Sequence, residues 1–267
     1  LQKFSTARAG FVRLDAVFRA QSVEESRRQN IRLSRVDGPI HVNNLVFKPE
    51  GASAPILNVN KLRVNPGEHI GVVGSVGSGK STFLKCLAGV ITPNEGSVSY
   101  DAFDTSAIHQ ADLRRAVAYL GQSPGIFSGT VRDNLLLGND QVSEDVMLEV
   151  IKVTGLDAVL KKLPNGLSFI LSEGGRELSG GQKQILALAR ALISQPSTVL
   201  LDEPTSAMDP KHEQLFIKHM REFVSGRTMV VVTHRKPILA LTERIIVIEG
   251  GRVVLDGGRD EVLARFK

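Results

Sequence analysis

The chain has 267 residues, enough for one large domain, and its 42% hydrophobic and 23% charged content is typical of soluble globular proteins. Its single cysteine, Cys86, excludes an internal disulfide and favours a reducing compartment. No apolar run approaches the ~20 residues that span a bilayer, so we expect no membrane crossing by this chain itself.

The formal net charge of +5 is concentrated near the beginning of the chain. Residues 1–40 hold eight Lys and Arg against four Asp and Glu, and so carry +4 of it. The near-neutral remainder argues against a broad nucleic-acid surface. A basic segment fits the cytoplasmic side of a membrane, where anionic lipid attracts Lys and Arg, and a solvated helix face explains it equally well.

The first predicted element is a helix over residues 3–28, because Phe4, Phe11, Leu14 and Phe18 recur at helical spacing. Gly38-Pro39 then marks a boundary. We therefore expect residues 1–37 to form an amphipathic lead-in helix and linker, and residues 38–267 to form the main domain. Because the first residue is Leu, we also expect the chain to be a fragment of a longer protein.

Strands are predicted over residues 41–47 and 56–64, before a turn at Asn65-Pro66-Gly67. The apolar run 70–73 then leads into a glycine-rich stretch, and a helix-forming run over 83–88 follows it. This order of buried strand, glycine-rich loop and helix is the context of a phosphate-binding loop.

The residue types in this loop suit a nucleoside triphosphate. Gly74, Gly77 and Gly79 permit positive φ and close approach of a ligand, at the positive end of the following helix. Lys80 adds a positive charge for the terminal phosphates, and the Ser81 hydroxyl is placed to hold Mg²⁺. The predicted loop residues are Gly74, Ser75, Val76, Gly77, Ser78, Gly79, Lys80, Ser81 and Thr82.

Further along, short strands alternate with helices, which predicts an α/β fold with a mainly parallel sheet. The region from about 121 to 180 has helical runs broken by Gly and Pro, and we interpret it as a helical insertion. The predicted strands are 96–100, 198–201, 229–232, 245–248 and 253–255, and the predicted helices are 111–115, 182–194, 211–224 and 237–242.

Two further motifs carry chemistry. Asp202 and Glu203 follow a buried strand, at the end that faces the ligand crevice of an open α/β sheet. Such a pair suits Mg²⁺ binding by Asp202 and general-base catalysis by Glu203. The run Leu178-Ser179-Gly180-Gly181-Gln182 opens a helix and forms a second anion site from a hydroxyl, backbone N–H groups and the helix dipole.

With these motifs, residues 38–267 resemble the nucleotide-binding domain of ABC transporters. The resemblance implies a P-loop NTPase (RecA-like) core with a mainly parallel sheet, an N-terminal antiparallel β subdomain and an α-helical insertion. It assigns 74–82 to the phosphate loop and 178–182 to the signature. Gln122 resembles the family's glutamine that contacts Mg²⁺ and water, Asp209 its loop to the partner subunit, and His234 its switch histidine on the γ-phosphate.

The resemblance also implies a mechanism. Two chains enclose two ATP molecules head to tail, so that Ser179 and Gly181 of one copy complete the γ-phosphate cradle of the other. The implied catalytic residues are Glu203, His234 and Gln122, and Gly180, Gln182 and Asp209 join the nucleotide contacts. The implied cofactors are ATP and Mg²⁺, and the implied metal ligands are Ser81, Gln122 and Asp202.

Other stretches resemble exporters. The run 125–134 is similar to the exporter stretch that meets the membrane domain's intracellular helices, and 172–176 to the loop before the signature. Residues 111–115 and 173–175 bring the resemblance closest to type I secretion ATPases, which export unfolded polypeptides, and this implies a location at the cytoplasmic face of a bacterial inner membrane. The implied partners are a second copy, a transmembrane domain of the same polypeptide and an exported polypeptide; lipid or small-molecule export is the alternative.

Two other classes of nucleotide-binding protein fit the sequence less well. A soluble ABC clamp on DNA or ribosomes is disfavoured because the chain has no long coiled-coil insertion, tandem domain or phosphate-binding stripe, and we expect no nucleic-acid partner. A signalling GTPase lacks the signature and needs an Asn-Lys-x-Asp motif that is absent here. One departure from exporters is expected near Pro49. Exporters usually have an aromatic residue at this position, which stacks on adenine, whereas here the nearest aromatic residue is Phe47.

Overall fold

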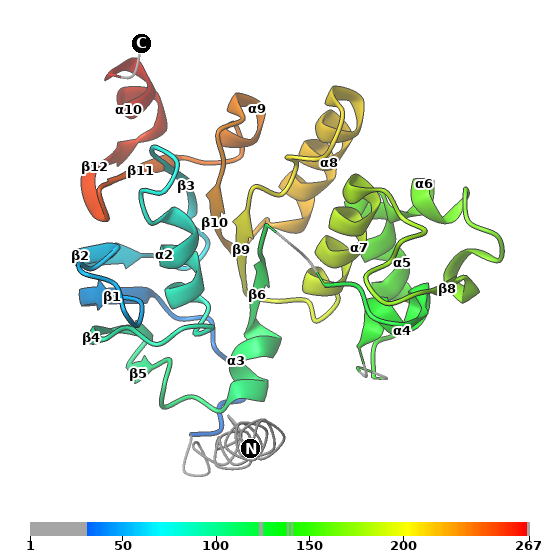
Figure 1. Ribbon diagram of the computed structural model, residues 1–267, viewed down its shortest axis with the longest axis horizontal. Helices are drawn as coiled ribbons and strands as arrows, with labels where there is room; N and C mark the ends of the chain where they lie inside the picture. Colours follow the sequence, from blue (N-terminus) through cyan, green and yellow to red (C-terminus); the bar gives the residue numbers. More distant parts are fainter. Residues whose placement is uncertain (1–30, 123–124, 138, 140, 266–267) are drawn as a thin grey trace, which may run out of the picture.

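The computed structural model describes residues 31–265, except 123, 124, 138 and 140. Two sheets and a group of helices build this part of the chain (Figure 1). The predicted helix over 3–28 lies outside the described residues.

The first sheet is antiparallel and has four strands in the order β2-β1-β4-β5. β1 alternates buried and exposed side chains along most of its length, as expected of a strand with one face on the core. The strands are β1 (Ile40–Phe47), β2 (Leu57–Val64), β4 (Glu95–Tyr100) and β5 (Phe103–Asp104). The predicted antiparallel subdomain is confirmed.

The second sheet has six strands in the order β12-β11-β3-β10-β9-β6, and only β12 pairs antiparallel to its neighbour. The strands are β3 (His69–Val73), β6 (Val117–Leu120), β9 (Thr198–Asp202), β10 (Thr228–Val232), β11 (Arg244–Glu249) and β12 (Arg252–Gly258). The mainly parallel sheet is thus confirmed. The short edge strand β6 was not predicted, because four residues directly after a helix carry no period of their own.

Alternate side chains of this sheet face two different cores. Leu200 and Val230 belong to the core that holds α2 (Lys80–Leu87), whereas Val199 and Val231 belong to the core that holds α7 (Gly180–Leu192). Because successive residues of a strand point to opposite faces, α2 and α7 cover opposite faces of the sheet. Figure 1 shows the two helices apart, with β10, β9 and β6 between them.

The predicted helical insertion is present and contains one element that the sequence did not indicate. Its helices are α4 (Val131–Leu136), α5 (Glu144–Thr154), α6 (Leu156–Leu160) and the 3-10 helix η2 (Gly166–Ser168). A two-stranded antiparallel sheet of β7 (Gly129–Thr130) and β8 (Ile170–Leu171) joins its ends. The remaining helices are α3 (Gln110–Ala116), α8 (Pro210–Phe223), α9 (Lys236–Leu239) and α10 (Arg259–Arg265).

Asp112 of α3 fixes the beginning of the described chain. Its side chain is 3% exposed and accepts hydrogen bonds from Arg32 Nε (2.8 Å), Arg32 Nη2 (3.1 Å) and the Leu33 N–H (3.0 Å). Burial alone raises the pKa of this carboxyl, but the bonds from Arg32 and Leu33 outweigh it and lower the pKa. The carboxylate form therefore stabilises the fold.

We predict that Asp112→Asn lowers the free energy of unfolding by ~1.5–3 kcal/mol at neutral pH, the scale of hydrogen bonds to a charged group. A lowered folded-state pKa contributes stability above the unfolded value of about 3.9, and that stability is lost as pH falls through the folded value. The gap between wild type and variant should therefore close in strong acid. Denaturant titrations between neutral and acid pH measure it.

The matched control is Asp157→Asn. It removes a half-exposed carboxylate of α6 that forms an ion pair with Lys161, one turn further along at the C-terminal cap of the same helix. We expect less than ~0.5 kcal/mol from that change. Equal effects of the two variants would contradict the role assigned to Asp112.

Candidate functional site

The glycine-rich loop between β3 and α2 forms a tight concavity. Gly74 has φ 148°, and a Cβ there would lie 2.0 Å from the Ile248 carbonyl oxygen of β11. Gly79 has φ 100°, and a Cβ there would lie 2.8 Å from the Ile56 carbonyl oxygen. Only glycine fits at either position.

Lys80 lies across this loop and is 7% exposed. Its Nζ donates to the carbonyl oxygens of Gly74 (2.8 Å) and Ser75 (2.6 Å), and among the described residues it has no ion pair. Burial lowers the pKa of Lys80, against the opposing charges of Glu203, Glu249 and Asp202. α2 also begins without a side-chain cap, so its first N–H groups face the same concavity. A buried cation beside an uncapped helix N-terminus fits an anion such as a phosphate.

Glu249, at the end of β11, holds the loop from the neighbouring strand. It accepts from the Ser75 N–H (2.8 Å) and the Ser75 hydroxyl (2.5 Å), and these bonds lower the pKa of its carboxyl. Sequence reasoning missed this residue. An acidic residue directly after the apolar run 245–248 was the available signal, the same one that singled out Asp202 and Glu203.

Three oxygen-bearing side chains converge beside the loop. Gln122, which follows β6, places its Nε2 3.4 Å from Ser81 Oγ and 3.4 Å from Asp202 Oδ1. Asp202 is buried at the end of β9. A carboxylate, a hydroxyl and an amide are the hard donors that Mg²⁺ prefers. These residues fit that ion.

Glu203 has an uncommon backbone conformation. Its φ is 51°, in the left-handed region, where a non-glycine residue costs about 1–3 kcal/mol unless its surroundings hold it. Its N–H donates to the Val232 carbonyl (2.9 Å), and its Oε2 accepts from the Thr233 hydroxyl (3.3 Å). His234 Nε2 lies 3.7 Å from Glu203 Oε1. The carboxylate is thus brought to the residues that follow β10.

The signature run begins α7 two residues earlier than predicted. Ser179 is the N-cap: its oxygen accepts from the Gln182 N–H (3.3 Å) and its own N–H donates to Gln182 Oε1 (2.8 Å). This capping box places Gly180 and Gly181 in the helix. The Ser179 hydroxyl proton is left to donate elsewhere. Ser179, Gly181, Gln182 and Asp209 together line a cavity of about 170 Å³.

The predicted site residues therefore form two groups. The phosphate loop, Gln122, Asp202, Glu203 and His234 gather at one edge of the six-stranded sheet. The signature and Asp209 lie together on the side of α7. No hydrogen bond or ion pair within the described ranges joins residues 74–82 to residues 178–182, and their helices cover opposite faces of the sheet.

Comparisons with known proteins identify the family of the chain. A family model described as "ABC transporter" matches residues 57–206. The cyclolysin secretion/processing ATP-binding protein CyaB of Bordetella pertussis is 35% identical over 87% of this chain and 33% of its own length. P-glycoprotein 14 of Caenorhabditis elegans is 34% identical over 93% of this chain and 19% of its own. The solved structure of a bacterial Atm1-family ABC exporter with ATP bound has a TM-score of 0.81 and 28% identity, over 99% of this chain and 46% of that one.

The chain thus spans about a third or less of the length of these curated relatives. Within residues 31–265, leaving out the four uncertain positions, no helix is both long and apolar enough to cross a bilayer.

Gly181 and Gly180 make a matched pair for testing the packing of the signature helix. A Cβ on Gly181 would lie 2.7 Å from the Ala207 carbonyl oxygen, whereas a Cβ on Gly180 has nothing within 4 Å. We predict that Gly181→Ala lowers the melting temperature, because overpacking costs about 1–3 kcal/mol. Gly180→Ala should leave it unchanged or raise it, since Ala exceeds Gly in helix propensity by up to ~1 kcal/mol.

Thermal unfolding of the two variants beside wild type measures the difference. Equal melting temperatures would contradict the close approach of α7 to Ala207.

Proposed function

We propose that this chain, which belongs to the ABC transporter family, is the ATP-binding and ATP-hydrolysing domain of a membrane exporter and works as a head-to-tail dimer. The observation that carries the proposal is the separation of the phosphate loop from the signature, since the helices that follow them, α2 and α7, cover opposite faces of one sheet. A phosphate held by the loop of one copy meets a signature only if a second copy supplies it.

In this proposal the triphosphate of ATP lies in the concavity of residues 74–82. Lys80 neutralises phosphate charge, and the N–H groups of the first turn of α2 bind phosphate oxygens. Ser81, Gln122 and Asp202 would hold Mg²⁺, which supplies charge neutralisation at the phosphates when bound.

Glu203 acts as the general base. Its carboxylate takes a proton from the water that attacks the γ-phosphate, and the Thr233 hydroxyl orients it. His234, on the other carboxylate oxygen, contacts the γ-phosphate. The left-handed backbone of Glu203 fixes where the carboxylate points, which is the kind of strain that active sites retain.

The second copy completes the cradle from its signature. The Ser179 hydroxyl proton and the N–H groups of Gly180 and Gly181 point out of the start of α7, where the helix dipole favours an anion. Gln182 orients Ser179 through the capping box. Asp209, beside this cap, contacts the other copy. ATP binds the closed dimer better than the open one and so shifts the population toward it.

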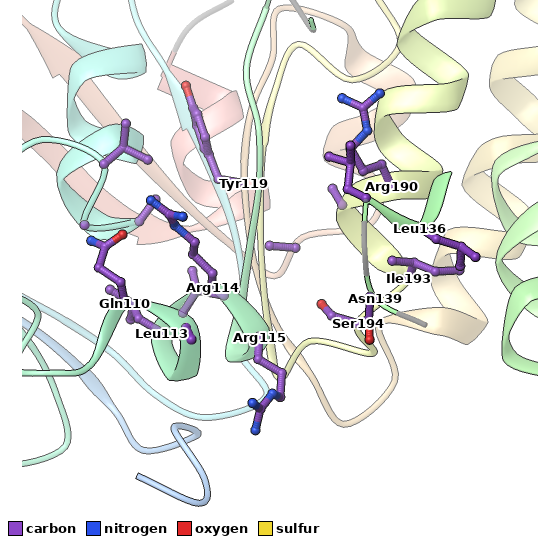
Figure 2. Close-up of a pocket in the computed structure, with 18 residues that line it drawn as sticks. Gln110, Leu113, Arg114, Arg115, Tyr119, Leu136, Asn139, Arg190, Ile193 and Ser194 are labelled. Atoms are coloured by element: carbon purple, nitrogen blue, oxygen red, sulfur yellow. The ribbon is translucent and has the colours of Figure 1, made fainter. Parts of the chain in front are cut away.

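Export is supported by a cavity of about 780 Å³ between α3, β6 and the C-terminal ends of α4 and α7. Figure 2 shows Gln110 and Arg114 on one side of it and Leu136 and Arg190 on the other. We propose that an intracellular helix of a membrane domain in the same polypeptide docks here. Residues 125–134, which resemble the exporter contact stretch, lie against it through Arg190.

Arg190 joins this stretch to the signature helix. Its Nη1 donates to the Gly125 carbonyl (2.7 Å) and its Nε to the Asn134 carbonyl (2.7 Å), and it lies over the Phe127 ring at 5.3 Å. Phe127 is 54% exposed and free to contact a partner. Because Arg190 and Ser179 belong to one helix, a displacement of residues 125–134 is transmitted to the signature.

The exported substrate is proposed to be a polypeptide, and the location the cytoplasmic face of a bacterial inner membrane. The likeness to CyaB, named for cyclolysin secretion, supports this assignment. The likeness to P-glycoprotein 14 and to an Atm1-family exporter keeps lipid or small-molecule export as the alternative. Residues 38–267 are the ATP-binding domain in this proposal, and residues 1–37 lead in from the membrane domain.

Phe47 is proposed as the adenine contact, taking the role of the aromatic residue that exporters carry near the position of Pro49. It ends β1 half-buried, and its carbonyl accepts from the Ile56 N–H (2.9 Å). Ile56 in turn abuts Gly79 of the phosphate loop. The backbone of Phe47 is thus linked through Ile56 to the phosphate loop, and its ring packs half-buried at the margin of the core.

We predict that hydrolysis by the chain requires Mg²⁺ and rises faster than linearly with protein concentration, because each site needs two copies. Glu203→Gln should lower turnover by about 10²-fold or more, the scale of removing a general base. It should also trap an ATP-bound dimer. Steady-state phosphate release and size-exclusion chromatography with ATP measure the two effects.

Glu222→Gln, an exposed change on α8, is the control and should behave as wild type. Turnover linear in concentration and insensitive to Glu203→Gln would refute the proposal.

For Phe47→Ala we predict a 5- to 100-fold rise in KM for ATP with kcat little changed, since base stacking on an aromatic is worth about 1–3 kcal/mol. Phe47→Tyr should retain the wild-type KM. An unchanged KM in Phe47→Ala would exclude Phe47 as the adenine contact.

A further inference from the structure

Gln184 lies in the second turn of α7 and is 4% exposed. Both ends of its side-chain amide form hydrogen bonds with the loop that follows β9. Its Nε2 donates to the Glu203 carbonyl (2.7 Å) and to Ser206 Oγ (3.3 Å), and its Oε1 accepts from the Ala207 N–H (3.2 Å). A carbonyl must accept and an N–H must donate, so these partners fix which end of the amide is which.

The Glu203 carbonyl that Gln184 binds belongs to the residue with left-handed φ. Inside the loop, this carbonyl accepts one further bond, from the Ser206 N–H (3.2 Å). A hydrogen bond from a buried amide to this carbonyl opposes rotation of the strained peptide toward the ordinary region. It thereby fixes the direction in which the Glu203 side chain leaves the backbone.

The same loop is held from its other side by Arg235, the residue after His234. Its Nη1 donates to the Met208 carbonyl (3.2 Å) and to Glu213 Oε1 (3.0 Å), and its Nη2 to the Ser206 carbonyl (3.4 Å). Gly181 brings the first turn of α7 against Ala207. Residues 203–209 are therefore fixed between the signature helix and the segment that carries His234.

We propose that Gln184 is a positioning residue for hydrolysis, which couples the signature helix to the Glu203 and Asp209 of its own chain. The proposal rests on the function proposed above. Through this amide, a shift of α7 on meeting the nucleotide of the partner changes the orientation of Glu203 at the chain's own nucleotide. Each copy thereby reports the state of one site to the other.

The test compares Gln184→Leu and Gln184→Glu with wild type in the full chain. Leu keeps the volume and removes every bond, whereas Glu keeps an acceptor for Ala207 and loses the donor to the Glu203 carbonyl. We expect kcat to fall about 10- to 100-fold in both, the scale of misplacing a catalytic group by about 1 Å, while KM for ATP stays within twofold. Gln214→Leu, an exposed change on α8, is the control and should keep the wild-type kcat.

A second measurement does not depend on hydrolysis. Hydrogen exchange of the nucleotide-free chain should show faster exchange over residues 203–209 in Gln184→Leu, because the Ala207 N–H loses its acceptor, and unchanged exchange over α2. If the variant exchanges faster over residues 203–209 but the wild-type chain does not hydrolyse ATP, the link between α7 and this loop is supported and the proposed function is refuted.

Wild-type kcat in Gln184→Leu, or unchanged exchange over 203–209, would overturn the proposal. A fall in kcat accompanied by an equal rise in KM and by faster exchange throughout α2 and α7 would also overturn it, since that pattern belongs to a general loss of structure.

Discussion

The arrangement of this molecule depends on the parallel pairing of β6, β9, β10 and β3. Parallel strands end at the same edge of their sheet, so the loops that follow them meet there. That edge collects Gln122, Asp202, Glu203, His234 and the phosphate loop from segments far apart in the chain. The alternation of side chains along the same strands places α2 on one face and α7 on the other. One sheet therefore gathers these residues and keeps the signature away from the phosphate loop.

α7 joins three parts of the proposed mechanism along a single rigid element. Its N-terminus carries the signature, its second turn holds Glu203 through Gln184, and its last turn holds the stretch 125–134 through Arg190. With a rise of about 1.5 Å per residue, the helix spans the distance between the docking cavity and the signature without a hinge. In the proposed mechanism, this one helix therefore links the membrane domain, the nucleotide of the partner copy and the chain's own general base.

How much could be predicted depended on whether the signal was local. The phosphate loop, the acidic pair and the signature were recognisable because glycine spacing and strand ends constrain adjacent residues, and the α/β fold with its antiparallel subdomain is confirmed. The start of α7 was placed two residues late, because the capping box of Ser179 and Gln182 was not recognised. β6 was missed because its four residues directly follow a helix and carry no period of their own.

Gln184 could not be singled out as a positioning group, because its partners come from another segment of the chain. A buried glutamine inside an apolar helix carries no sequence signal for the carbonyl it binds. Only the packed structure places it against Glu203.

The central claim is that each complete site needs the phosphate loop of one copy and the signature of another. Mixing two inactive variants tests it directly: Lys80→Ala, which keeps its signature, and Ser179→Arg, which keeps its phosphate loop. The account predicts that the mixture hydrolyses ATP although neither variant does so alone, because a mixed dimer holds one intact site. A mixture no more active than the average of the two separate variants would contradict the account.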